Sequence, residues 1–193
     1  MTAMNAPAAM TEPAVMTATG APAALTAKAA PAAALAVGRP LTVRLGLPPR
    51  LREIVRQLGA TPPAVSRTPR LRLEIEGMVP PRAAVGIRVF LNAPGAGSDT
   101  PISDPHYVGS FTFGEAPTAQ GGADGAAGKA RGKESFLLDP GRVLAALPPE
   151  QRLLEGKDLA VTLIATPLRA GEDLAGTSIP VARIELSVAF ESS

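Results

Sequence analysis

Residues 71–92 read LRLEIEGMVPPRAAVGIRVFLN and contain two short runs in which side chains of opposite character alternate. In the first run, three aliphatic residues alternate with charged residues up to Gly77. In the second run, aliphatic residues occupy every other position from Val85 to Leu91. A period of two with one apolar face is typical of a strand that is buried on one side. The stretch therefore predicts two strands that each turn one face toward a core.

The same alternation occurs in other parts of the chain. Five further runs are found at residues 41–47, 107–113, 136–138, 159–165 and 184–190. In the run at 107–113, we expect Tyr107 on the same face as Phe111 and Phe113. Seven alternating runs without repeating helices between them favour a mainly β fold, an antiparallel two-layer β-sandwich, over a parallel sheet.

Two short helices are expected between the strands. Apolar side chains at the spacing i, i+3, i+4 and i+7 from Leu51 predict the first helix, which begins near Pro49 and ends at Gly59. The second helix is expected to begin with Asp139 as its N-cap residue and Pro140 at its first helical position.

The N-terminal segment differs in composition from the rest of the chain. Residues 1–36 are rich in Ala, and prolines interrupt them at intervals. Alanine favours helix, but the prolines stop a helix, and Ala buries too little surface to offset the entropy cost of ordering. We therefore expect a disordered tail over 1–36 and one β-sandwich domain over 37–193. Residues 114–132, which are rich in Gly and Ala, are predicted to form a long flexible loop.

The same N-terminal segment has no feature of a membrane or secretion signal. No basic residue precedes Lys28, and no window reaches the roughly 18 apolar residues that a membrane helix requires. The chain is also free of cysteine, which is typical of a protein from a reducing compartment. We expect a cytoplasmic protein without membrane contact, with secretion as the alternative.

The composition excludes several classes of function. With no Cys and one His, the chain cannot build a thiolate or multi-histidine metal site. Its 19 basic and 17 acidic residues give a net charge of +2, which is too small for a nucleic-acid-binding surface. Gly128 and Lys129 do not form a phosphate-binding loop, because Ala130 stands where Ser or Thr would hold magnesium. We therefore predict no cofactor, no metal site, no nucleic-acid partner and no catalytic residue.

The segment Ser103–Tyr107 is the most distinctive polar segment of the chain. In one interpretation it is a binding or proton-transfer site, in which Asp104 orients His106 and Tyr107 takes part. In the other, Asp104 and Pro105 shape a turn, and His106 forms a hydrogen bond where the strand begins. The turn interpretation is favoured, and Asp104, His106 and Tyr107 remain candidate binding residues.

Basic residues supply the remaining candidate contacts. Lys129 and Arg131 close the flexible loop and are candidate contacts for an anion or a protein partner, with a solvated linker as the alternative. Arg72 and Arg88 are expected to lie on solvated strand faces. The aromatic residues of 107–113 are expected in the core rather than on a platform for a ligand.

Five segments follow one another in a distinctive order. They are LRLEIEGMVPPRAAVGIRVFLN at 71–92, SDPHYVGSFTFG at 103–114, SFLLDPGRVLAAL at 135–147, LAVTLIATPL at 159–168 and IPVARIELSV at 179–188, with AVGRPLTVRLGL at 36–47 before them. This order resembles the C-terminal β-sandwich domain of tyrosinase-family proteins, the polyphenol oxidases with a type-3 copper centre. The resemblance covers about residues 36–190 and supports the predicted sandwich.

The copper domain of that family has no counterpart in this sequence. Enzymes of the family hold two coppers with six histidines, and the only histidine here is His106. The resemblance implies a capping domain that lies over a copper site and blocks substrate entry. We therefore predict a non-catalytic protein-interaction domain that binds or shields a separately encoded copper oxidase or another subunit. The alternative is a structural or assembly subunit that self-associates through its strand edges.

Overall fold

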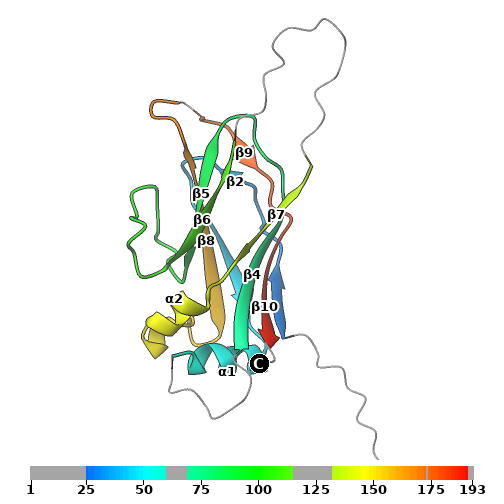
Figure 1. The fold of residues 1–193 in the computed structure, drawn as a ribbon, viewed down its shortest axis with the longest axis vertical. Helices are drawn as coiled ribbons and strands as arrows, with labels where there is room; N and C mark the ends of the chain where they lie inside the picture. The colour runs from blue at the N-terminus through cyan, green and yellow to red at the C-terminus, as the bar shows by residue number, and fades with distance from the viewer. Residues whose placement is uncertain (1–24, 60–68, 115–131, 173, 191–193) are drawn as a thin grey trace, which may run out of the picture.

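Two four-stranded antiparallel sheets pack face to face in the computed structural model, which describes residues 25–59, 69–114, 132–172 and 174–190 (Figure 1). The first sheet has the strand order β1-β10-β4-β7, and the second has the order β3-β8-β5-β6. Their strands are β1 (Thr26–Ala29), β3 (Leu41–Gly46), β4 (Pro69–Met78), β5 (Val85–Leu91), β6 (Tyr107–Phe113), β7 (Glu134–Leu138), β8 (Asp158–Pro167) and β10 (Arg183–Phe190). All seven predicted strands are present, so the predicted antiparallel sandwich is confirmed.

Shorter elements lie at the two ends of the sandwich. The strands β2 (Leu35–Ala36) and β9 (Ser178–Ile179) form a small antiparallel pair at the upper end in Figure 1. The helices α1 (Pro49–Gln57) and α2 (Gly141–Ala146) lie at the lower end (Figure 1), and the short 3-10 helix η1 (Pro149–Gln151) follows α2 along the chain.

Aliphatic side chains from both sheets fill the space between them. On β4, Leu73 and Ile75 are fully buried, and they pair in register with Leu186 and Ile184 of β10. Burying one such side chain contributes about 1.5–3 kcal/mol relative to leaving it in water. The alternation that predicts the strands therefore also selects the residues of the core.

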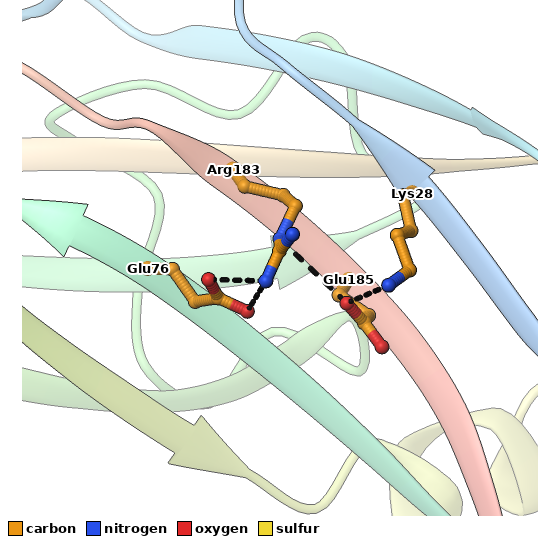
Figure 2. A network of polar contacts seen from close by, with 4 residues as sticks. All are labelled: Lys28, Glu76, Arg183 and Glu185. Carbon is orange, nitrogen blue, oxygen red and sulfur yellow. Dashed lines mark hydrogen bonds and ion pairs between the residues drawn. The ribbon is translucent and has the colours of Figure 1, made fainter.

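A row of charged residues crosses the outer face of the first sheet (Figure 2). Arg183 Nη2 on β10 donates to both carboxylate oxygens of Glu76 on β4, at 2.6 and 2.5 Å. This hydrogen bond to Glu76 raises the pKa of Arg183 above its ordinary value. Glu185 forms ion pairs on both sides, since its Oε2 lies 3.6 Å from Arg183 Nε and 2.9 Å from Nζ of Lys28 on β1. Charges of alternating sign thus connect three neighbouring strands.

The fold begins earlier in the chain than the sequence predicts. A disordered tail was expected over 1–36, but β1 and β2 both lie inside that range. Ala27 is buried in β1, and Leu35 is fully buried in β2. Ladder hydrogen bonds to β10 stabilise β1 even though Ala27 is its only buried residue, and that distant pairing leaves no trace in the local composition. Strands of the fold therefore occur at residues that were expected in the tail, and residues 1–24 lie outside the described residues.

The first predicted helix is confirmed, and the start of the second is shifted by one residue. Pro49 is the first residue of α1, and Gly59 beyond its end has a φ of +75°, as a terminating glycine does. Pro140 is the N-cap of α2 rather than its first helical residue. Asp139 therefore lies one residue before the N-cap and does not occupy the capping position itself. Instead, its Oδ1 accepts a hydrogen bond of 2.9 Å from the N–H of Gly141.

Candidate functional site

The loop of residues 92–106 covers the outer face of the second sheet. A two-layer sandwich buries only the inner face of each strand. Strands β5 and β8, however, are buried on both faces. On the outer side, Phe90, Ile164 and Ala96 form a second apolar cluster, and Tyr107 packs against it. Ala96 comes from the loop, which lies beside the sheet on the left in Figure 1. The loop therefore acts as a partial third layer.

Arg88 fixes this loop from the sheet beneath it. Its Nη1 donates to the carbonyl oxygen of Thr100 at 2.6 Å, and its Nη2 donates to the carbonyl oxygen of Ser98 at 2.5 Å. The Thr100 hydroxyl in turn accepts a hydrogen bond of 2.9 Å from the N–H of Gly97. The expectation that Arg88 lies on a solvated face is wrong, because the loop carbonyls take its donors and leave the side chain half-buried. Arg72 is exposed, as expected.

Asn92 begins the loop in a left-handed conformation, with a φ of 52°. Its Nδ2 donates to the carbonyl oxygen of Gln151 at 2.9 Å, and its Oδ1 accepts from the N–H of Ala160 at 3.0 Å. The buried amide thus joins the end of β5 to β8 and to η1. Nothing in the sequence separates Asn92 from an ordinary turn residue, since both of its partners are distant in the chain.

The predicted polar segment forms the turn that returns the loop to β6. Asp104 Oδ1 accepts a hydrogen bond of 2.8 Å from the backbone N–H of His106. His106 Nδ1 lies 2.8 Å from the carbonyl oxygen of Leu91, and because a carbonyl only accepts, Nδ1 carries the hydrogen. Asp104 therefore shapes the main chain and does not pair with the imidazole. The geometry agrees with the turn interpretation, whereas binding at these residues stays a prediction.

Tyr107 lies on the opposite face of the sheet from Phe111, and this corrects the expected shared face of the aromatic residues in β6. The register between β5 and β6 shifts between Val89 and Phe90. A bulge of this kind inserts one residue and reverses the alternation beyond it. As a result, the Tyr107 ring packs 5.5 Å from Phe90 on the outer face, while Val108 packs against the main core.

The other aromatic residues of β6 join the two sheets along one side of the sandwich. Phe111 on β6 stacks on Phe136 of β7, with the ring centroids 3.7 Å apart. Phe113 meets the same Phe136 ring edge-on at 5.4 Å. Because β6 and β7 belong to different sheets, these three rings close the space between them. The expected core position is confirmed for Phe113, which is buried, and Phe111 is half-buried against the same core.

A groove of about 560 Å³ lies between the beginning of β6 and α2. This α2 groove is lined by Pro105, Tyr107, Val108, Asp139, Arg142, Val143 and Ala146. A second space of about 270 Å³, the β7 cavity, adjoins it and is lined by Arg70, Leu71, Arg72, Leu137, Leu138 and Asp139. Both surfaces combine aliphatic side chains with arginines. Of the predicted site residues within the described ranges, only Tyr107 lines either space.

Three large apolar side chains of the described residues are exposed. Ile102 on the loop is 65% exposed, Leu137 on β7 is 60% exposed, and Leu168 after β8 is 51% exposed. Water contact with such side chains forgoes the free energy of burial, and covering any of them by another molecule would recover it. Leu137 also lines the β7 cavity.

Arg152 is a buried cation that no sequence pattern indicated. It is 6% exposed, and its guanidinium donates to the carbonyl oxygens of Leu147, Arg56 and Ala145 at 3.0, 2.7 and 3.5 Å. Carbonyls at the ends of helices lack partners within the helix, and a cation there is favourable. Arg152 thus joins the last turns of α1 and α2 and holds the helix that lines the α2 groove.

The remaining predictions concern the basic residues of the long loop, metal binding and membrane contact. Lys129 and Arg131 lie outside the described residues. Within the described ranges, no group of three or more His, Asp or Glu side chains could hold a metal ion. Among the helices of the described residues, none has both the length and the apolar character needed to cross a membrane.

Comparison with known proteins finds similarity in structure alone. No family model matches the chain, and no curated protein matches it. A latent aurone synthase (polyphenol oxidase) from natural source is 17% identical with a TM-score of 0.47, over 81% of this chain and 26% of that chain. The recombinantly expressed latent aurone synthase is 16% identical with a TM-score of 0.45, over 81% of this chain and 25% of that chain.

This chain therefore spans about a quarter of the length of those solved chains.

Proposed function

We propose that this chain is a non-catalytic protein-interaction domain that binds another protein through the loop of residues 92–106. The supporting observation is Ile102, an aliphatic side chain that is 65% exposed on a loop held in place by Arg88. A contact residue on a fixed loop loses little conformational entropy when it binds, so more of its burial energy contributes to affinity.

The proposed partner is a separately encoded copper oxidase of the type-3 class, or another subunit, which this domain shields. The order of the sequence segments supports this partner, since the resemblance implies a domain that lies over a copper site. In this proposal the redox chemistry belongs entirely to the partner, and the chain contributes a fixed contact surface.

The proposal is tested by mixing the full chain with any type-3 copper oxidase that is encoded in the same genome. Co-elution in size-exclusion chromatography reports the complex, and quinone formation from a catechol reports shielding. We expect one joint peak and a lower rate of quinone formation. Ile102→Asp should weaken the complex by roughly tenfold or more, because it puts a charge into a buried contact.

The matched control is Leu168→Asp, which makes the same change at an exposed leucine away from the loop. This variant should bind and shield like the wild type. The proposal fails if the unaltered chain forms no complex with the oxidase. It also fails if both substitutions weaken the complex equally.

Strand β7 supports a second candidate, a structural or assembly subunit that forms homo-oligomers. Among the described strands, β7 lies at the edge of its sheet, and its Leu137 is 60% exposed. The opposite edge strand β1 carries Lys28, a charge of the kind that discourages edge pairing. Light scattering separates the two candidates, because only this one requires a mass above the monomer for the isolated chain. Leu137→Lys should then restore the monomer.

A further inference from the structure

We propose that the α2 groove and the β7 cavity together bind an extended, acidic segment of the partner protein. This inference rests on the proposed function and specifies the chemistry of the partner. The two spaces share Asp139 as a lining residue, which places them next to each other where β7 is followed by α2, and together they are called the track. A single compact ligand would fill one of the two spaces, whereas an extended chain occupies both.

The charge of the track is the first argument. Arg72 and Arg142 are exposed, and neither makes a hydrogen bond or an ion pair with another of the described residues. Among the described residues that line the track, Asp139 is the only one with a carboxylate. Its Oδ1 already accepts a hydrogen bond from the N–H of Gly141. The track therefore offers two guanidinium groups, which bind carboxylates through paired hydrogen bonds.

The apolar lining is the second argument. Leu137 is exposed beside Arg72 in the β7 cavity, and Tyr107, Val108 and Val143 are half-buried in the α2 groove. An extended chain presents successive side chains to opposite sides. A segment in which acidic and aliphatic residues are mixed can thus satisfy the arginines and cover the exposed leucine at the same time.

The test is a selection of random heptapeptides displayed on phage against the full-length chain. We expect the enriched peptides to combine two or more Asp or Glu residues with aliphatic residues. A synthetic peptide from this set should then bind in fluorescence anisotropy, and more weakly as salt is added. Arg142→Glu and Arg72→Glu should each weaken its binding by roughly tenfold, because each reverses the charge that meets a carboxylate.

The matched control is Arg82→Glu, the same change at an exposed arginine on the chain between β4 and β5 that lines neither space. This variant should bind the peptide within about twofold of the wild type, as surface charges far from a contact do. Thermal unfolding of all three variants confirms that each is folded. Using two separate charge reversals keeps the test decisive if one of them fails to fold.

Three results would overturn the inference. The enriched peptides could lack carboxylates, or they could bind the Arg142→Glu and wild-type chains equally. Succinate could displace the peptide at a concentration close to the peptide's own dissociation constant, which would indicate a small-carboxylate site instead. Failure here is separable from failure of the proposed function, because Ile102 lines neither space. An oxidase complex that needs Ile102 and ignores Arg142 contradicts only the acidic-segment proposal.

Discussion

Arg152 Nη1 donates a hydrogen bond of 2.7 Å to the backbone carbonyl oxygen of Arg56, although 96 positions separate the two residues in the chain. The same guanidinium also bonds the carbonyls of Leu147 and Ala145. One buried side chain thereby sets the distance between the ends of α1 and α2. Since α2 forms one wall of the α2 groove, Arg152 positions the groove without lining it.

Replacing Arg152 should therefore destabilise the domain and disturb the groove. For Arg152→Met we expect a loss of about 3 kcal/mol in the free energy of unfolding, because buried carbonyls lose charged donors. Urea unfolding measures the loss. Arg50→Met is the matched control, since Arg50 is exposed on α1 and should change stability by less than about 0.5 kcal/mol. Equal stability of the two variants would contradict the role assigned to Arg152.

Two substitutions of Asn92 test whether its backbone conformation or its side-chain hydrogen bonds contribute more to stability at the beginning of the loop. Asn92→Ala should cost about 2–3 kcal/mol, because it removes two buried hydrogen bonds and places Ala at a positive φ. Asn92→Gly loses the same bonds but relieves the backbone, so it should be about 1 kcal/mol more stable than the Ala variant. Thermal or urea unfolding of the pair gives the order, and the reverse order would contradict this explanation.

The stacked rings between the sheets allow a measurement of coupling. Phe113→Ala should cost about 3–5 kcal/mol, as for other buried Phe residues, and Phe111→Ala should cost less because Phe111 is half-buried. A double-mutant cycle of Phe111 and Phe136 should give a coupling of about 0.5–1.5 kcal/mol. A coupling near zero would show that the stacking contributes nothing beyond burial.

Arg88 should control the order of the loop rather than the stability of the whole domain. In Arg88→Met, the amide hydrogens of Ala96, Gly97 and Thr100 should exchange roughly tenfold faster, because the loop loses two charged hydrogen bonds. Exchange in the centre of β4 and β10 should stay at the wild-type rate. Uniformly faster exchange in every strand would mean instead that Arg88 supports the global fold.

Sequence alternation predicts the long strands because their faces are defined locally. In β4 and β10 every second side chain is aliphatic, so the period identifies both the strand and its buried face. The pairs β1 with β10 and β2 with β9 were not predicted. Strands of four and two residues are too short to show a period, and their stability comes from ladder partners about 140 to 160 positions away in the chain.

The candidate site is less accessible to prediction than the fold. The segment Ser103–Tyr107 was identified, and its turn follows from the ordinary behaviour of Asp before Pro. The bulge that turns Tyr107 outward depends on how β6 aligns with β5. The sequence of one strand alone does not determine this alignment. In the sequence, Arg88 and Arg152 cannot be distinguished from surface arginines. Every acceptor that they use is a backbone carbonyl, which every type of residue carries.

The two long margins of the sandwich are closed in different ways. On one side, aromatic rings on β6 and β7 bridge sheets that share no ladder there, whereas on the other side β1 lies directly against β3. The stacking of the rings on β6 and β7 weakens as soon as the rings separate. The closely packed main chains of β1 and β3, in contrast, must move together. When the domain is heated or pulled, we therefore expect the two sheets to separate first at Phe111 and Phe136, with water entering the interior from that side.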